Sequence, residues 1–392
     1  MPGGGWQNEF RIWRREIDLW LLGLVLLLMF GGTIAVATAS PASAARLSTD
    51  DTQLPGLYFF WKHIGFQIAG IVAMLGASLL SRDNARRVGV LLAAAMLVLL
   101  LLVPFIGYEV NGAKRWIRFG MGIQPSEFLK PGFAIALAWV LSWRLRDPDL
   151  PVIRVATLGM ALVVVPLVFQ PNLGAAVLFT GVWLTLILLA GAPIRAIGAA
   201  IGLGIAALTA LYFFYDNMRH RIEAYLGGGS EFDQVNTAAR TLLSGGWSGT
   251  GMWLGEAKNR LPEAHTDYIF SVIGEEFGLI ACAALVILYA AIILRVLVRL
   301  ADEENLFVLL AGAGLVTQLG GQAFINILVN LQLLPSKGMT LPLVSYGGSS
   351  TVAVCLAVGL LLAITRRNPY LGKRTPGLRA IMADHRADRS TP

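Results

Sequence analysis

The chain has 392 residues, of which 56% are hydrophobic and only 14% are charged. Charged residues make up about a quarter of an ordinary soluble domain, so that class of protein is excluded. The net charge of +7 does not indicate a nucleic-acid partner, because the basic residues lie in short loops and tails beside apolar runs. Cys282 and Cys355 lie inside such runs, which favours small buried side chains over a disulfide or a metal pair.

Runs of apolar residues occupy most of the chain. The length of each run is close to the roughly 20 residues that a helix needs to cross a bilayer. They predict an all-α, polytopic membrane protein with about ten transmembrane helices. One membrane domain is expected over residues 18–371, between an N-terminal tail at 1–17 and a C-terminal tail at 372–392. The expected spans are 18–38, 57–80, 88–106, 127–143, 152–169, 173–190, 194–215, 267–297, 306–331 and 343–364.

Basic residues gather in alternate connections between these spans. The positive-inside rule places those connections in the cytoplasm, together with both termini. The large connection at about 216–266, between helices 7 and 8, is then extracytoplasmic. The residues that set this orientation are Arg11, Arg14, Arg15, Arg82, Arg86, Arg87, Arg144, Arg146, Arg154, Arg195, Arg295, Arg299, Arg366, Arg367, Lys373 and Arg374.

The first apolar run has an alternative interpretation as a cleaved signal peptide. It follows a basic stretch and precedes the small residues Ala42, Ser43 and Ala44. However, the run is long enough to span, and its removal would leave nine helices. We therefore expect it to remain as the first span.

The outer connection after the third span carries cations that the positive-inside rule does not explain. Lys114, Arg115 and Arg118 lie there beside Trp116. Cations outside the membrane suit an anionic lipid head group, above all a phosphate or diphosphate. An interfacial helix, with arginines that extend to the head groups and Trp116 as an anchor, fits equally well.

The fourth span begins with the segment Gln124–Lys130, which contains two ionisable residues close together. Lys130 lies about a turn into the span, where an ionisable side chain is costly and usually functional. Glu127 precedes it by three residues, so the two side chains could also simply pair with each other.

The long outer connection is rich in glycine, with Gly227-Gly228-Gly229, Gly245-Gly246 and Gly249-Thr250-Gly251. A connection of this length is usually functional or disordered. It also contains Trp247 and Trp253, so we expect an ordered loop that packs on the outer face as a mobile lid.

Glu263, His265 and Asp267 follow at the point where the chain re-enters the membrane. Asp267 begins span eight, where an isolated aspartate most often caps the helix. Deeper in the same span, Glu275 and Glu276 require partners or a wet cavity. The spacing of Glu263, His265 and Asp267 does not fit metal ligands on one helix face, so no metal site is expected.

Span nine carries four amide side chains at intervals of four residues, which form one polar stripe on a helix. Hydrogen bonding between helices is the preferred explanation. The alternative is a hydrophilic wall of a cavity open to the outside. The four residues are Gln318, Gln322, Asn326 and Asn330.

The last outer connection, Leu334–Ser350, contains Lys337, a further external cation, and Ser345 in a Ser-Tyr-Gly-Gly-Ser-Ser sequence. Its prolines and glycines imply irregular backbone near membrane depth. Such backbone is stable only when it is buried in protein or lines an aqueous cavity.

These segments together resemble the SEDS family (shape, elongation, division and sporulation) of peptidoglycan polymerases, from about Asp18 to Leu371. The resemblance is carried by Asn-Gly-Ala-Lys-Arg-Trp, Gln-Pro-Ser-Glu, Leu-Pro-Glu-Ala-His-Thr-Asp-Tyr-Ile-Phe, Gly-Glu-Glu-Phe-Gly and Pro-Leu-Val-Ser-Tyr-Gly-Gly-Ser-Ser. Lys-Gly-Met-Thr-Leu-Pro and Ala-Lys-Arg-Trp-Ile-Arg resemble the cell-division branch more than the elongation branch. The family commonly has Gln-Pro-Asp-Leu-Gly where this chain has Asn172 in place of the Asp, so a role there would be geometric.

The resemblance implies that Asp267 is the acidic residue essential for polymerisation. It further implies lipid II as substrate, a class B penicillin-binding protein as partner together with other divisome membrane proteins, and a location in the bacterial cytoplasmic membrane at the division septum. The remaining expected substrate-binding residues, besides the cations discussed next, are Glu263, His265, Trp116, Ser345, Gln124 and Glu127.

A chemical mechanism follows from these residues. Lipid II carries its sugar on a diphosphate, whose departure needs charge neutralisation, and Arg115, Lys130 and Lys337 could supply it. A divalent cation, Mg²⁺ or Mn²⁺, is compatible but not required. Asp267 would accept the proton of the acceptor hydroxyl, by analogy with inverting glycosidases. A lipid II flippase and a non-enzymatic divisome scaffold remain as alternative functions.

Overall fold

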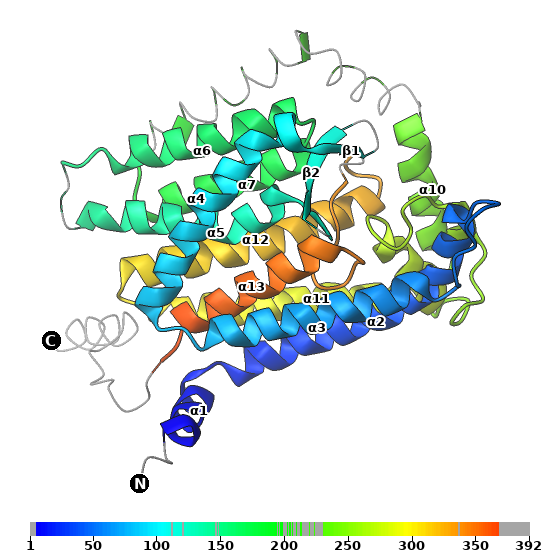
Figure 1. Ribbon diagram of the computed structural model, residues 1–392, viewed down its shortest axis with the longest axis horizontal. Coiled ribbons are helices and arrows are strands. Elements are labelled where there is room, and N and C mark those ends of the chain that lie inside the picture. Colours follow the sequence, from blue (N-terminus) through cyan, green and yellow to red (C-terminus); the bar gives the residue numbers. More distant parts are fainter. Residues whose placement is uncertain are drawn as a thin grey trace, which may run out of the picture.

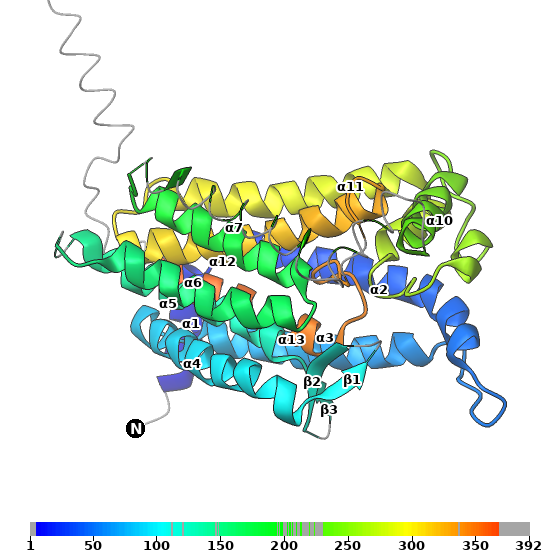
Figure 2. The same cartoon turned by 90° about the horizontal axis from the view of Figure 1, so that it is seen from above.

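The computed structural model describes residues 5–110, 113–119, 121–145, 147, 149–193, 230–335 and 338–367, with scattered positions between 195 and 223. Its helices run roughly along one axis (Figure 1). α1 and the end of α13 lie at one end of this bundle, while α10 and a small sheet lie at the other. α12 and α13 lie between α11 and α4 when the bundle is seen from above (Figure 2).

The described part of the chain has seven helices that are long and apolar enough to cross a membrane, and the shorter apolar helices α7 and α13 join them. This confirms an all-α, polytopic membrane protein. The expected span at 194–215 and the C-terminal tail at 372–392 lie largely or wholly outside the described residues, so the number ten stays a prediction. The helices are α1 (Gly5–Glu16), α2 (Leu19–Leu47), α3 (Tyr58–Ser78), α4 (Arg82–Ile106), α5 (Pro125–Ser142), η1 (Trp143–Leu145), α6 (Val152–Phe169), α7 (Leu173–Leu189), α10 (Ser230–Ser244), η2 (Ala257–Arg260), α11 (Ile269–Leu300), α12 (Leu306–Asn330) and α13 (Gly348–Ile364).

The outer connection after α4 is a sheet, so the interfacial helix considered for it is wrong. β1 (Tyr108–Val110), β2 (Ala113–Phe119) and β3 (Met121–Ile123) pair antiparallel in that order. Ala113 and Ile117 are buried, whereas Lys114 and Arg118 are exposed. Because side chains alternate along a strand, Arg115 shares the inward face with Ala113 and Ile117.

α11 is broken at Gly278, which has φ +80° inside the helix. The amide of Leu279 donates to Gly246 O at 3.0 Å, and the carbonyl oxygens freed before the break accept from Thr250 N at 2.8 Å and Gly251 N at 3.0 Å. We call residues 245–260 the clamp loop. This described part of the outer connection is ordered and packed, as the sequence predicts, whereas the expected motion of a lid stays a prediction.

Glu275 and Glu276 in α11 are buried and hold the clamp loop. Glu275 accepts from the amides of Ala257 at 2.6 Å and Lys258 at 2.9 Å. Glu276 pairs with the Lys258 ammonium group and accepts from the amide of Trp253. The expectation that acids at this depth need partners is therefore confirmed.

Gly278→Ala is expected to destabilise the protein. A Cβ atom there would lie 2.3 Å from Trp247 O and 2.5 Å from Gly249 N. The positive φ alone adds about 1–3 kcal/mol of strain for a residue with a side chain. Thermal unfolding in detergent measures the effect. Gly65→Ala in α3 is the matched control, because nothing lies within 4 Å of its Cβ position. The free energy of unfolding of this variant should differ from that of the wild type by less than about 1 kcal/mol.

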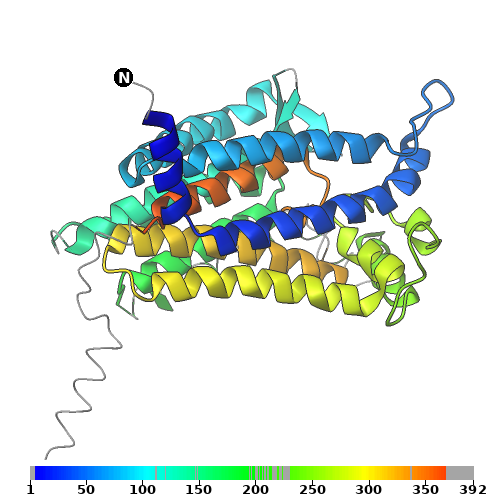
Figure 3. The same ribbon diagram turned by 90° about the horizontal axis from the view of Figure 1, so that it is seen from below.

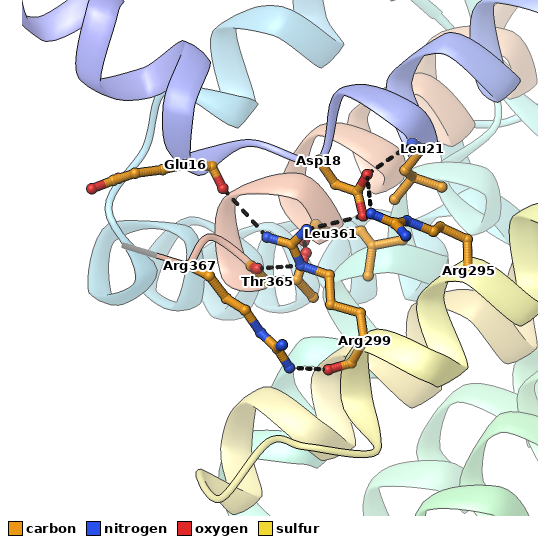
Figure 4. A network of polar contacts seen from close by, with 8 residues as sticks. All are labelled: Glu16, Asp18, Leu21, Arg295, Arg299, Leu361, Thr365 and Arg367. Atoms are coloured by element: carbon orange, nitrogen blue, oxygen red, sulfur yellow. Dashed lines mark hydrogen bonds and ion pairs between the residues drawn. The ribbon is translucent and has the colours of Figure 1, made fainter. Parts of the chain in front are cut away.

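An ion network closes the opposite end of the bundle (Figure 4). The buried Asp18 carboxylate accepts from Leu21 N at 3.1 Å, and it pairs with Arg295 at 2.8 Å and Arg299 at 3.0 Å. Arg299 also donates to Thr365 O at 3.0 Å. The start of α2 is thereby tied to the ends of α11 and α13, and α2 runs beside α11 from this network to the outer end (Figure 3).

Candidate active site

Asp267 lies in a turn just before α11, and its backbone is held from α12. Asn326 and Asn330 donate their side-chain amides to Asp267 O at 2.8 and 3.1 Å. The N-cap position of α11 is Tyr268, so the helix-cap explanation of Asp267 is wrong. The side chain of Asp267 is half-buried, and its backbone is held by α12.

Gly338 lies close to both Asp267 and Arg115. A Cβ atom on Gly338 would lie 3.7 Å from Asp267 Oδ2 and 3.8 Å from Arg115 Nη1. Gly338 also has φ +61°, which favours glycine. The last outer connection therefore runs closely past both charged groups.

The pKa of Asp267 is raised to about 7, chiefly by burial and to a smaller extent by the negative charge of Glu263, while the positive charge of Arg115 partly opposes the rise. A carboxylate with a pKa near the working pH is well matched to general base catalysis, because it is available as the base and still holds a proton firmly. The environment of Asp267 therefore suits it to accept a proton.

Arg115 connects β2 to the turn between α6 and α7. Its Nε donates to Gln170 O at 3.0 Å and its Nη2 to Pro171 O at 2.5 Å. The next residue, Asn172, is buried and occupies the N-cap position of α7, where its side chain makes no capping hydrogen bond. The two hydrogen bonds to Gln170 O and Pro171 O hold the guanidinium group of Arg115, and its positive charge acts on Asp267.

Lys130 is buried, 3% exposed, and forms the expected pair with Glu127 at 2.7 Å. Its ammonium group also donates to Gln322 Oε1 at 2.8 Å, and Gln322 in turn donates to Thr340 O at 3.0 Å. Lys130 therefore acts on the last outer connection through Gln322. These contacts with Glu127 and Gln322 satisfy the ammonium group of a lysine that is buried a turn inside the membrane domain.

The amide side chains of the polar stripe on α12 donate hydrogen bonds mainly to backbone oxygens. Gln322 binds Thr340, Asn326 binds Met339 and Asp267, and Asn330 binds Asp267 and accepts from Ser271. Hydrogen bonding between helices is therefore confirmed for Gln322, which accepts from Lys130 of α5, and for Asn330, which accepts from Ser271 of α11. Asn326 instead binds the two connections that carry Met339 and Asp267. In the described part of the chain, only the buried Oε1 of Gln318 among the four side chains has no hydrogen-bond partner.

His265 and Ser345 join the Asp267 segment to the last outer connection. The His265 ring lies 4.1 Å from Phe59 and 5.3 Å from Tyr346, centroid to centroid. Ser345 Oγ donates to Thr266 O at 2.5 Å. Burial lowers the pKa of His265 to about 4, so its ring is neutral at pH 7. The two side chains support the site from within, and their predicted contact with substrate stays a prediction.

The other expected site residues are less closely gathered. Glu263 is exposed and accepts from Thr266 Oγ1 at 2.8 Å. Trp116 lies on the strand face opposite Arg115, and Gln124 is half-buried at the start of α5. Lys337 lies outside the described residues. Within the described ranges, no group of three His, Cys, Asp or Glu side chains could hold a metal ion, and a divalent cation remains a prediction.

Sequence reasoning missed two contributors to the site, Gly338 and Gln170, and identified Gln322 only as a member of the polar stripe on span nine. Gly338 is close to both charged groups, Gln170 offers its backbone oxygen to Arg115, and Gln322 links Lys130 to Thr340. The four-residue spacing on α12 contained the signal for Gln322. The other two act through their backbone, which the residue type does not reveal.

Known proteins resemble this chain in sequence over most of its length. Residues 18–370 match the FtsW/RodA/SpoVE family, described as "Cell cycle protein". The probable peptidoglycan glycosyltransferase FtsW of Caulobacter vibrioides (strain NA1000 / CB15N) is 36% identical over 360 residues, which cover 91% of each chain.

Two solved structures are similar in fold. One is a chain of a peptidoglycan synthase complex described as coordinating polymerization and crosslinking, with a TM-score of 0.72 and 26% identity over 89% of this chain and 97% of that one. The other is the rod shape determining protein RodA of Thermus thermophilus, with a TM-score of 0.65 and 27% identity over 89% and 96% of the two chains.

Proposed function

The chain belongs to the FtsW/RodA/SpoVE family, and we propose that it is a peptidoglycan glycosyltransferase that polymerises lipid II at the outer face of the cytoplasmic membrane. It is a multi-pass membrane protein. One observation carries the proposal. A single carboxylate, Asp267, combines a pKa near 7 with a neighbouring cation, Arg115, at the end of the bundle opposite the Asp18 network.

The reaction joins the sugar of one lipid II to a hydroxyl of another strand. Asp267 accepts the hydroxyl proton as the new C–O bond forms at the anomeric carbon. The bond from that carbon to the diphosphate breaks on the opposite face, so the configuration inverts. The diphosphate leaves with the electron pair, and Arg115 and Lys337 lower the energy of its charge.

Lys130 supports this chemistry indirectly, through its hydrogen bond to Gln322. Because it is buried and bonded to Glu127 and Gln322, it fixes the backbone of Thr340, two residues from Gly338. A correct position of that backbone sets the gap between Asp267 and Arg115, and small displacements at a catalytic centre reduce rates strongly.

The partner and the location belong to the same proposal. A class B penicillin-binding protein would crosslink the strands that this chain makes, which is supported by the likeness to a chain of a synthase complex for polymerization and crosslinking. Work at the division septum, with other divisome membrane proteins, is supported by the FtsW name of the curated relatives.

Polymerisation of lipid II by purified protein in phosphatidylcholine/phosphatidylglycerol vesicles tests this function. The cognate penicillin-binding protein is added with its transpeptidase blocked by a β-lactam, and glycan strands are separated by gel electrophoresis. Strands that depend on this chain support the proposal. Transfer of labelled lipid II across the bilayer without strands would instead favour a flippase, and neither activity in an assembled complex would favour a scaffold.

A further inference from the structure

The clamp loop exposes large apolar side chains outside the helices. Trp247 is 75% exposed, Leu254 70% and Trp253 54%. Leu243, at the end of α10, is 65% exposed. Such a cluster on a water-facing loop would be costly, and on a protein surface it usually marks contact with another molecule or a membrane.

The loop is attached at the level of the outer membrane boundary. Trp253 Nε1 donates to Ala37 O of α2 at 3.1 Å, and Ala37 lies about 28 Å along the helix from Asp18. Gly278, where the loop meets α11, lies about 31 Å from Arg299 on the same basis. Asp18 and Arg299 form the cytoplasmic ion network, and a hydrocarbon core is about 30 Å thick. Both attachment points therefore fall near the outer edge of that core.

The backbone of the loop is satisfied from within the protein, as irregular backbone at membrane depth must be. Carboxylate oxygens of Glu275 and Glu276 accept from three of its amides, and carbonyl oxygens of the same two residues accept from two more. A loop in water would not need two buried carboxylates for this purpose. The glycines permit the close approach, since a Cβ atom on Gly249 would lie 2.2 Å from Glu276 O.

The exposed apolar surface of the loop continues the lipid-facing surface of the bundle. Ile280, two residues beyond the break in α11, is 64% exposed, and its amide bonds to Trp247 O at 3.3 Å. Tryptophan is enriched at the boundary between head groups and acyl chains, because one end of its ring is apolar and the other donates a hydrogen bond.

From these contacts we infer that residues 243–254 are embedded in the outer leaflet, at the boundary between head groups and acyl chains. The occupant of this apolar surface is membrane lipid. The loop thereby anchors the segment that carries Asp267 at a fixed height above the bilayer, the level at which the diphosphate of a membrane-bound substrate would lie.

Depth-resolved fluorescence quenching tests this inference. Cys282 and Cys355 are replaced by alanine, and Leu254→Cys is labelled with an environment-sensitive fluorophore in the full-length protein. The vesicles contain phosphatidylcholine and phosphatidylglycerol, with a nitroxide on the head group, high in the acyl chain or at the chain end. Trp247→Cys provides a second site in case the first variant does not fold.

Asp50→Cys, in the exposed connection between α2 and α3, and Ile287→Cys, on the exposed face of α11, are the controls. The label at residue 254 should be quenched most by the nitroxide high in the chain, several-fold more than at residue 50, whereas the label at residue 287 should respond most to the chain-end nitroxide. A label at 254 that is quenched only by a water-soluble nitroxide, as at residue 50, would overturn the inference. Shielding of such a label by added penicillin-binding protein would then assign the surface to a protein partner.

Discussion

Asp267→Asn is expected to lower lipid II polymerisation by about 10²–10⁴-fold, the usual contribution of a positioned general base. Asparagine has nearly the same volume but cannot accept a proton at neutral pH. The segment is held by Asp267 O, which Asn326 and Asn330 bind, and the substitution leaves that contact intact. We therefore expect normal thermal unfolding and normal co-purification with the penicillin-binding protein.

Asp50→Asn is the matched control, because it removes a carboxylate from an exposed outer connection away from Asp267. Its rate of polymerisation should equal that of the wild type. If Asp267→Asn polymerised lipid II at the wild-type rate, Asp267 would not be the base, and a role in scaffolding or transport would gain support.

Lys130→Met is expected to destabilise the protein and to reduce polymerisation together. It leaves the Glu127 carboxylate, whose side chain is 12% exposed, without its cation, and such a loss costs about 3–5 kcal/mol. It also frees Gln322, so the backbone at Thr340 loses its fixed position. Unfolding in denaturant and the polymerisation assay measure the two effects.

The double variant Glu127→Gln/Lys130→Met separates them. Removing both charges should recover much of the lost stability, whereas polymerisation should stay low because Gln322 still lacks the ammonium group. Lys62→Met, at an exposed lysine of α3, controls for the loss of one outer lysine and should change neither quantity. A double variant whose destabilisation equals the sum of the two single variants would contradict a direct coupling between Glu127 and Lys130.

The helices and much of the site could be predicted from local sequence. Long apolar runs predict the helices, and the bounds of span eight, expected at 267–297 and observed at Ile269–Leu300, are close. Other bounds are wrong by more: α2 ends at Leu47 instead of residue 38, and α4 begins at Arg82 instead of residue 88. The sequence also identifies Asp267, Lys130 and the stripe on α12. Ionisable and amide side chains are costly at membrane depth, so their presence there indicates a function or a hydrogen-bonding partner. These inferences depend on single segments and their depth.

The strand β2, the break in α11 and the Asp18 ion network could not be predicted from the sequence, because they depend on tertiary contacts. The strand at Ala113–Phe119 was missed because Arg115 interrupts its apolar face, and only the Gln170 and Pro171 oxygens explain an arginine that points inward. The break at Gly278 needs the clamp loop to supply replacement hydrogen bonds. The pairing of Asp18 with Arg299 joins residues 281 positions apart, and no local pattern identifies such a partner.

The pH dependence of polymerisation in the variant Glu263→Gln tests most directly whether Asp267 acts as the base. The pKa of Asp267 is about 7 and is raised in part by Glu263. The wild-type rate should therefore fall as the pH drops through about 7, since protonation removes the base. Glu263→Gln removes a negative charge, lowers the pKa of Asp267 and should move this fall to lower pH. Glu256→Gln, at an exposed acid in the clamp loop, should leave it in place. A fall at the same pH in the wild type and in Glu263→Gln would contradict the account.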